Sequence, residues 1–283
     1  MTRRIAFQGE PGAFSHAATH ALFPDDTPVP CLNFEDTIAA VQDGSADYGV
    51  VPIENSIYGR VTDVHHLLPE SGLFIVGEHY LRIEMSLLGV PGARIEDLRA
   101  VQSLSVALGQ CRRFIQAHHL RTINGIDTAG SAKEVAEKGD PTVAAIASRF
   151  AGELYGLELL AENVEDANHN TTRFLVMSRT RHEAQRNGQK IKTTFVFRVR
   201  NVPAALYKAL GGFATNGVNM TKLESYQLGG KFFSTQFYAD IEGHPDDPNV
   251  ALALEELGFF SREVRILGVY AAHPFRATQS EDD

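Results

Sequence analysis

The sequence has no tryptophan, only two cysteines and no long hydrophobic run among its 283 residues. Cys31 and Cys111 lie far apart, so we expect no disulfide framework and a reducing, cytoplasmic compartment. The start, from Met1 to Phe7, enters a strand-like run after two basic residues and has no apolar stretch with a small-residue cleavage site. We therefore expect neither a secretory signal nor a membrane-spanning segment.

Positive charge is also scarce. The chain has 26 Lys and Arg residues against 35 Asp and Glu residues, which gives a formal net charge of -9 at pH 7. Proteins that bind nucleic acid or anionic membranes concentrate Lys and Arg, so we expect neither as a partner. The remaining composition, 43% hydrophobic and 22% charged residues, is typical of a globular protein, and the length suggests about two domains.

Short apolar runs alternate with helical patterns as far as residue 178, which predicts an α/β domain with parallel sheets. Polar residues follow several of the predicted strands, where ligands of α/β proteins bind, and we expect them to line a common cleft between two lobes. They are Ser15 after a glycine turn, Glu54, Asn55 and Ser56 after the run 48–53, Ser103 before a helix over 107–115, and Ser131 as a helix cap. His16 and His20 have a spacing that zinc sites use, but no third ligand is evident, so we expect no metal site.

The stretch Asn170–Phe174 places polar and charged groups directly before the apolar run 175–177, which we expect to be a short buried strand. The start of this strand carries an arginine, two hydroxyls and an amide. Together these groups can hold an anionic substrate and donate a proton to it. The alternative is that these residues only satisfy the backbone of a loop. The stretch alone does not separate the two alternatives.

The pattern changes after residue 178. Residues 179–192 are charged and almost without apolar side chains, which indicates a solvated linker. Beyond the linker we expect strands over 194–199, 220–228, 232–241 and 264–270, helices from Pro203 and over 250–257, and a turn at Gly229-Gly230. The order βαββαβ is that of the ferredoxin-like module. We assign this domain to 193–273, followed by a tail, 274–283, whose acidic end we expect to be disordered.

Taken together, the motifs resemble those of the prephenate dehydratase family joined to an ACT regulatory domain. The motifs are Ile5–Gly9 with Gly12 and Ser15, Pro52–Ser56 with Gly59, Ala107–Cys111, and Asn170–Phe174. The resemblance covers nearly the whole chain and implies a two-lobed catalytic domain like a type II periplasmic binding protein. We place that domain at 1–178, with lobe 1 at about 1–78 and 160–178 and lobe 2 at about 79–159.

The resemblance implies that the chain converts prephenate to phenylpyruvate in L-phenylalanine biosynthesis, with loss of water and carbon dioxide and without a metal or redox cofactor. It assigns to Thr172 the hydrogen bond that helps the hydroxyl leave, places Asn55 in the lining of the cleft, and gives Glu54 the role of orienting Asn55 or Arg173. Arg173 either clamps a carboxylate of the substrate or pairs with Glu54. The residues that the resemblance assigns to substrate binding are Ser15, Ser56, Ser103, Gln110, Thr171 and Phe174. Leu104-Ser105 stands where the family often has His-Pro, which favours Thr172 over a histidine as the donor.

The second domain resembles ACT modules, which bind amino acids at dimer interfaces. The resemblance therefore implies L-phenylalanine as a feedback inhibitor and a homodimer or homotetramer. The matching effector residues are Ala204, Ala205, Leu206, Glu224 and Ser225. Ala204 replaces a glycine of the motif and adds a methyl group where the backbone approaches the ligand, and Tyr226-Gln227 replaces Arg-Pro. These departures leave the strength of phenylalanine binding open.

Two other functions stay open. Arogenate dehydratase performs the same elimination on a substrate with an ammonium group in place of the keto group, and one or two contacts in the cleft separate the two enzymes. A non-catalytic amino-acid sensor uses the cleft for binding alone. We expect such a sensor to lose the pair Thr172-Arg173, which is intact in this chain.

Overall fold

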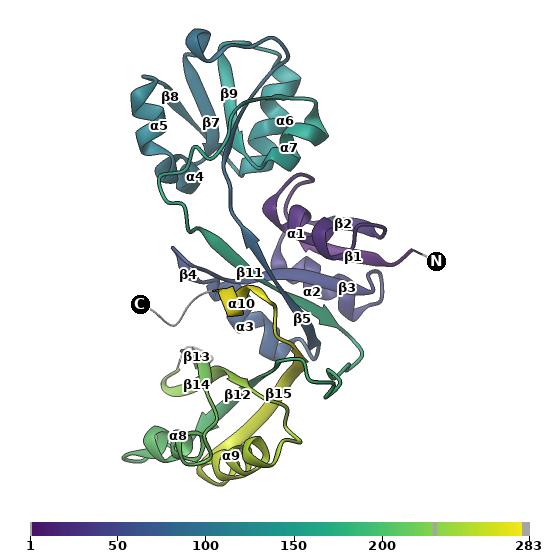
Figure 1. The fold of residues 1–283 in the computed structure, drawn as a ribbon, viewed down its shortest axis with the longest axis vertical. Helices are drawn as coiled ribbons and strands as arrows, with labels where there is room; N and C mark the ends of the chain where they lie inside the picture. The colour runs from purple at the N-terminus through teal and green to yellow at the C-terminus, as the bar shows by residue number, and fades with distance from the viewer. Residues whose placement is uncertain (1, 229–230, 279–283) are drawn as a thin grey trace. The chain divides into compact units, whose positions relative to one another are not determined.

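The computed structural model describes residues 2–228 and 231–278 (Figure 1). They form two compact units: unit 1 contains the residues up to 40, 50–61 and 80–174, and unit 2 contains 41–49, 62–79 and the chain from 175 onward. The turn expected at Gly229-Gly230 and the acidic end of the tail lie outside the described residues. Within the described part, no helix has both the length and the apolar character that crossing a membrane requires.

One sheet carries the N-terminal motifs of unit 1. Five neighbouring strands of this ten-stranded sheet are, in spatial order, β5 (Phe74–Arg82), β11 (Thr171–Ser178), β3 (Tyr48–Asn55), β1 (Arg4–Gln8) and β2 (Thr27–Cys31). β1 and β2 are parallel and are followed by α1 (Phe14–Leu22) and α2 (Phe34–Gln42), whereas β4 (Gly59–Arg60) pairs antiparallel with β3. The run Ile5-Ala6-Phe7 is fully buried, as expected of a strand covered on both faces. β3, β5 and β11 each contribute residues to both units.

The second sheet of unit 1 is mixed, which corrects the expectation of parallel sheets. Its strands, in spatial order, are β10 (Glu158–Ala161), β6 (Ser86–Gly89), β9 (Val143–Ala147), β7 (Ala100–Leu104) and β8 (Arg121–Gly125). β7 runs parallel to β8 and β9, but β6 runs antiparallel to both of its neighbours. The alternation of strands and helices predicted the parallel strands of this sheet. It did not predict the antiparallel direction of β6, because the chain enters β6 directly from β5 without a helix between them.

The helices around the second sheet begin at residues that the sequence only partly indicated. They are α4 (Ser105–Gln110), α5 (Arg112–Ala117), α6 (Thr128–Lys138) and α7 (Arg149–Tyr155). The helix expected over 107–115 is broken at Cys111, whose φ of -114° leaves the helical range. The cap of α6 is Asp127, whose carboxylate accepts from Gly130 N at 2.7 Å. Ser131, the expected cap, lies inside the helix and donates to Asp127 O.

The C-terminal part of unit 2 confirms the predicted βαββαβ order. Its elements are β12 (Ile191–Val199), α8 (Ala205–Thr215), β13 (Met220–Leu228), β14 (Lys231–Glu242), α9 (Pro248–Phe260) and β15 (Ser261–Ala271). The strands form an antiparallel sheet in the order β13-β14-β12-β15, with α8 and α9 side by side (Figure 1). Phe195, Phe197, Phe213 and Leu257 pack in the core between the helices and the sheet. Unit 2 also contains α3 (Thr62–Glu70) and α10 (Phe275–Thr278).

Two features tie this sheet to the rest of unit 2. β15 continues onto β5 through a parallel pairing of Gly268 with Ile75, and a Cβ at Gly268 would lie only 2.2 Å from Ile75 O. The supposed linker is also anchored, because the Arg179 guanidinium donates to the carbonyl oxygens of Val41 and Ala46. The expectation of a solvated linker over 179–192 holds for most of its side chains, but Arg179 binds two backbone carbonyls, and Ile191 and Lys192 are buried at the start of β12.

The face of this sheet opposite its helices contains a buried polar network. Lys192 Nζ lies 3.4 Å from Asp240 Oδ2, and both side chains are fully buried. Thr194 Oγ1 donates to Asp240 Oδ1 at 2.6 Å and lies 2.7 Å from the Tyr270 hydroxyl. A buried ion pair of this kind needs such additional hydrogen bonds to offset the loss of water.

The segment after β15 is fastened to β5. Glu78, whose side chain is buried, accepts hydrogen bonds from His273 N at 2.9 Å and from Arg276 Nε at 3.3 Å. The imidazoles of His79 and His273 meet edge to face, with ring centroids 5.3 Å apart. Burial is the main cause that lowers the pKa of both imidazoles below the usual 6.5.

Candidate active site

The two most specific motifs of the sequence meet in unit 1. Ser56 follows β3 and Thr171 begins β11, and these strands are neighbours in the sheet. Ser56 N donates to Thr171 O at 2.9 Å, and Thr171 N donates to Ser56 Oγ at 2.9 Å. The Ser56 hydroxyl in turn donates to His169 O at 2.8 Å. Ser56 and Thr171 therefore join the two motifs, which brings Asn55 beside Thr172.

The Asn55 amide has only one orientation that satisfies its neighbours. Its Oδ1 accepts from Ile57 N at 2.9 Å and from Tyr58 N at 3.0 Å. Its Nδ2 donates to Asn170 Oδ1 at 2.7 Å and to Thr172 Oγ1 at 2.9 Å. A flipped amide would place N–H groups against backbone N–H donors.

The hydrogen bonds of Asn55 also orient the Thr172 hydroxyl. Thr172 Oγ1 accepts from Asn55, so the hydroxyl proton of Thr172 remains available to another acceptor. The side chain is only 8% exposed, and its place in β11 fixes the backbone that carries it. The arrangement presents one neutral donor whose oxygen is already held by an amide.

The expected pairing of Arg173 with Glu54 is present. Arg173 Nη1 lies 2.9 Å from Glu54 Oε1, and the arginine is 1% exposed. A planar guanidinium and a carboxylate at this distance form a charge-assisted hydrogen bond. The geometry thus favours the structural pair over an arginine that is free to bind a carboxylate of the substrate. The pair also stabilises the start of β11, which begins before the short strand that the sequence predicted.

Other expected substrate contacts are less accessible than their residue types suggested. Ser103 is fully buried and its hydroxyl donates to Ile146 O at 2.6 Å, while Phe174 belongs to the core at 1% exposure. Both side chains therefore stabilise the fold in this structure, which corrects their assignment to substrate contact. Ser15 is buried in α1, where its carbonyl accepts from Thr19 Oγ1. Gln110 ends α4, and its carbonyl accepts from Asp166 N at 2.6 Å.

Asn170 is a residue of the site that sequence reasoning named in its motif but did not assign. It is 1% exposed, and its side chain accepts from Asn55 across 115 residues of sequence. Its backbone oxygen accepts from Ile83 N at 2.8 Å. The signal available in the sequence was its position two residues before Thr172, which gave no indication of a partner in β3.

The glycine turn before α1 serves the fold. Gly9 and Gly12 have φ values of 113° and 93°, which favour glycine. Gly12 N donates to His16 Nδ1 at 3.0 Å, so the imidazole is an acceptor there, and burial lowers its pKa below 6.5 with a smaller contribution from His20. Ser148 Oγ donates to Gly12 O at 2.7 Å. Among the described residues, no group of three or more His, Cys, Asp or Glu side chains is arranged to hold a metal ion.

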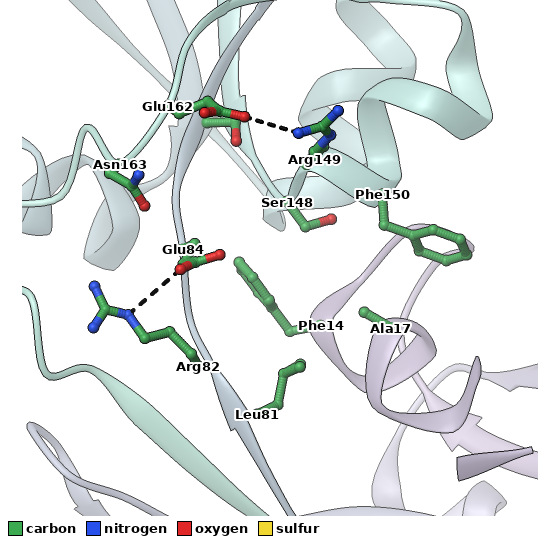
Figure 2. A pocket seen from close by; sticks show the side chains of 11 residues that line it. Phe14, Ala17, Leu81, Arg82, Glu84, Ser148, Arg149, Phe150, Glu162 and Asn163 are labelled. Atoms are coloured by element: carbon green, nitrogen blue, oxygen red, sulfur yellow. Dashed lines mark hydrogen bonds and ion pairs between the residues drawn. The ribbon is translucent and has the colours of Figure 1, made fainter. Parts of the chain in front are cut away.

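A cavity of about 220 Å³ lies elsewhere in unit 1, and we call it the α1–α7 cavity. Its lining comes from α1, the end of β5 and the segment after it, the start of β6, α7 with its cap, and the segment after β10: Phe14, Ala17, Leu81, Arg82, Glu84, Ser86, Ser148, Arg149, Phe150, Glu162 and Asn163 (Figure 2). Arg149 Nη1 lies 2.9 Å from Glu162 Oε1, and Arg82 Nε lies 3.8 Å from Glu84 Oε1. The lining does not include Asn55 or Thr172.

A second cavity, of about 290 Å³, lies at the start of α8 in unit 2. We call it the α8 cavity; it is lined by Val199, Arg200, Asn201, Val202, Ala204, Ala205, Leu206, Tyr207, Thr235 and Phe237. Three of the five expected effector residues are in this lining. Ala204 has a φ of 61°, a left-handed conformation that favours glycine. Glu224 and Ser225 lie on β13, where Glu224 Oε1 lies 3.3 Å from Lys222 Nζ.

The chain is similar over nearly its whole length to proteins whose names include prephenate dehydratase. The family model described as prephenate dehydratase matches residues 5–182. A bifunctional N-acyl-homoserine lactone acylase/prephenate dehydratase of Komagataeibacter europaeus is 53% identical, over 97% of this chain and 98% of that protein. Arogenate dehydratase/prephenate dehydratase 1, chloroplastic, of Arabidopsis thaliana is 38% identical, over 94% of this chain and 71% of that protein.

Solved structures of proteins with related sequences have the same fold as this chain. The structure of GqqA, described as a novel type of quorum quenching acylases, has a TM-score of 0.91 and 53% identity, and the match covers 97% of this chain and 100% of that one. Prephenate dehydratase from Arthrobacter aurescens in complex with L-Phe has a TM-score of 0.86 and 33% identity, over 95% of this chain and 90% of that one. The α/β fold with its C-terminal βαββαβ domain is therefore confirmed.

Proposed function

This chain belongs to the prephenate dehydratase family. From that premise we propose that the Thr172 hydroxyl donates a hydrogen bond to the ring hydroxyl of prephenate as this hydroxyl leaves. The reaction removes carbon dioxide and water and leaves the aromatic ring of phenylpyruvate. Electrons of the broken carbon–carbon bond to the carboxylate flow into the ring, and the hydroxyl leaves at the other end with its bonding electrons and takes up one proton from solvent to become water. A donor positioned at this oxygen contributes about 10²–10⁴-fold to the rate.

One observation carries this proposal: the hydrogen bond from Asn55 Nδ2 to Thr172 Oγ1 at 2.9 Å. A donor that is already oriented needs no reorganisation when charge develops on the leaving oxygen. Glu54 and Arg173 support the same strand ends through their ion pair. In the role we give them they hold Asn55 and Thr172 in place, and they extract no proton because the reaction requires none.

Thr172→Val and Thr172→Ser form a matched pair for testing the donor. Valine keeps the shape of threonine without the hydroxyl, and we expect it to lower kcat by about 10²–10⁴-fold. Serine keeps the hydroxyl, so we expect it to retain most of the turnover. Phenylpyruvate formation is the readout, and near-normal turnover by the valine variant would remove Thr172 from the mechanism. Parallel measurements of kcat/KM on arogenate would decide between the two substrates.

We place L-phenylalanine, the feedback inhibitor, in the α8 cavity. The relative from Arthrobacter aurescens was solved with L-Phe. In this chain the cavity combines apolar side chains such as Leu206 and Phe237 with the Arg200 guanidinium and the start of α8, and a helix start favours a carboxylate. The catalytic domain at 1–178 and the ACT domain at 193–273 remain our proposed division, except that the ACT domain gains Ile191 and Lys192 from β12 and the connecting segment shortens to 179–190. We propose a homodimer or homotetramer in the cytoplasm as the working form.

Ala204→Gly tests the effector site. Glycine removes the Cβ and relieves the left-handed backbone, so we expect inhibition by phenylalanine at lower concentrations than in the wild type. Ala214→Gly, an exposed position of α8 outside the cavity lining, is the control. Phenylalanine is titrated against activity and against oligomer size. If neither responds in the wild type, the chain has no working effector site.

A second candidate function is N-acyl-homoserine lactone acylase activity. It is favoured by the 53% identity, over 97% of the chain, with the bifunctional relative. In this reaction water adds across the amide bond and releases a carboxylic acid and the amine of homoserine lactone. Mass spectrometry of the free homoserine lactone after incubation with purified protein tests it. Release no faster than with heat-inactivated protein would exclude this function.

A further inference from the structure

The α1–α7 cavity has one apolar side and one charged side. Phe14 and Ala17 come from α1, Leu81 from the end of β5 and Phe150 from α7 (Figure 2). These side chains surround a space that suits a short hydrocarbon chain, because apolar surface buried against them is removed from water.

The charged side of the cavity has no net charge. Arg82 and Arg149 contribute two positive charges, and Glu84 and Glu162 contribute two negative charges. Each arginine also contacts a further carboxylate, since Arg82 Nη2 lies 3.3 Å from Glu165 Oε1 and Arg149 Nε lies 3.2 Å from Glu153 Oε1. The positive and negative charges of this lining therefore balance, and it offers an anion no advantage over an uncharged ligand.

The lining also offers neutral hydrogen-bonding groups. Ser86 and Asn163 are among its members, and the carboxylates of Glu84 and Glu162 are acceptors for an amide N–H. Asn163 has a φ of 52°, a left-handed backbone conformation that asparagine adopts more readily than most other non-glycine residues. Asn163 thus supplies an amide at the cavity edge.

We propose that the α1–α7 cavity binds an uncharged acyl amide, with the acyl chain against Phe14, Leu81 and Phe150 and the amide towards the polar side. This inference rests on the second candidate function and names the binding site for its substrate class. The volume of about 220 Å³ is below the roughly 300–1,000 Å³ of pockets for larger ligands. The cavity therefore takes short acyl chains better than long ones.

Ala17→Leu fills the cavity and tests the proposal. Ala21→Leu is its matched control, because Ala21 lies one turn further along α1, is exposed and is not part of the lining. The probe is N-butanoyl-homoserine lactone, with binding followed by calorimetry, and prephenate turnover is measured on the same samples. We expect Ala17→Leu to weaken binding of the probe at least tenfold and to change kcat/KM for prephenate less than threefold, while Ala21→Leu changes neither.

Phe150→Ala keeps the test decisive if the Ala17→Leu variant does not fold. It removes one apolar side of the cavity, so we expect it also to weaken binding of the probe at least tenfold. Wild-type binding that both variants retain would place the acyl site elsewhere, even if the acylase function holds. Equal losses of probe binding and prephenate turnover would make the cavity part of the prephenate site and overturn the inference. No binding and no hydrolysis by the wild type would overturn the inference and the acylase function together.

Discussion

Replacing Asn170 by alanine is the sharpest test of how the Thr172 hydroxyl is held. Asn170 Oδ1 accepts from Asn55 Nδ2 at 2.7 Å, and Asn170 is 1% exposed. The substitution removes this acceptor and leaves the amide of Asn55 with Thr172 as its remaining side-chain contact. The perturbation therefore loosens the residue that orients the donor without touching the donor.

The magnitude follows from the hydrogen bond that is lost. A neutral hydrogen bond contributes about 0.5–1.5 kcal/mol net, and a buried donor without its partner costs about 1–3 kcal/mol. We expect Asn170→Ala to lower the free energy of unfolding by about 1–3 kcal/mol. If the same loss appears in the transition state, kcat falls roughly tenfold to hundredfold, because about 1.4 kcal/mol corresponds to a factor of ten.

The assay combines urea denaturation with steady-state turnover of prephenate in a double-mutant cycle. In the Thr172→Val background, Asn170→Ala should cost no further kcat, because there is no hydroxyl left to orient. Asn170→Asp keeps an acceptor oxygen and should recover part of the turnover. The control is Asn219→Ala, which removes an exposed hydrogen bond to Glu242. Full kcat in a destabilised Asn170→Ala variant, or additive losses in the cycle, would refute a positioning role.

Three further predictions concern stability. Asp240→Ala removes a carboxylate that lies 3.4 Å from the fully buried Lys192 ammonium and should lower the free energy of unfolding by about 3–5 kcal/mol in urea titrations; a loss below about 1 kcal/mol would contradict a tight pair. Burial holds the pKa of His79 and His273 below 6.5 in the fold, so the unfolded chain binds more protons and stability should fall as pH drops below about 6.5. His79→Asn should flatten that decline in thermal melts at pH 5–7, and an unchanged slope would count against it. Gly268→Ala places a Cβ 2.2 Å from Ile75 O and should lower the Tm by several degrees; an unchanged Tm would show that the strands separate freely.

Periodicity predicted the long elements well and the short ones poorly. The alternation over 194–199 and 220–241 gave the strands of the βαββαβ domain because one face of each packs on helices. β2 was missed because Pro28 and Pro30 interrupt its pattern, although proline is compatible with a strand at the edge of a sheet. α7 was missed although Ser148 caps its start and Gly156 its end, a signal that was readable in the sequence.

The sequence predicted which residue types form the candidate site, but it did not predict which of these residues contact one another. The motif around Thr172 identified the right segment, but the contact from Asn55 to Asn170 joins residues 115 apart in sequence. Burial was equally hidden, since a serine such as Ser103 looks the same in a sequence whether it faces a ligand or donates to the backbone of a neighbouring strand, as it does to Ile146 O. Only packing in three dimensions separates these cases.

The trio of Asn55, Asn170 and Thr172 is built from two carboxamides and an alcohol. None of these groups gains or loses a proton between mildly acidic and mildly alkaline conditions. A donor assembled from such parts has no ionisation state to be tuned, so its strength depends on geometry alone. In the role that we propose for Thr172, the strength of the donor would therefore stay the same through swings of acidity that change the charge of an imidazole.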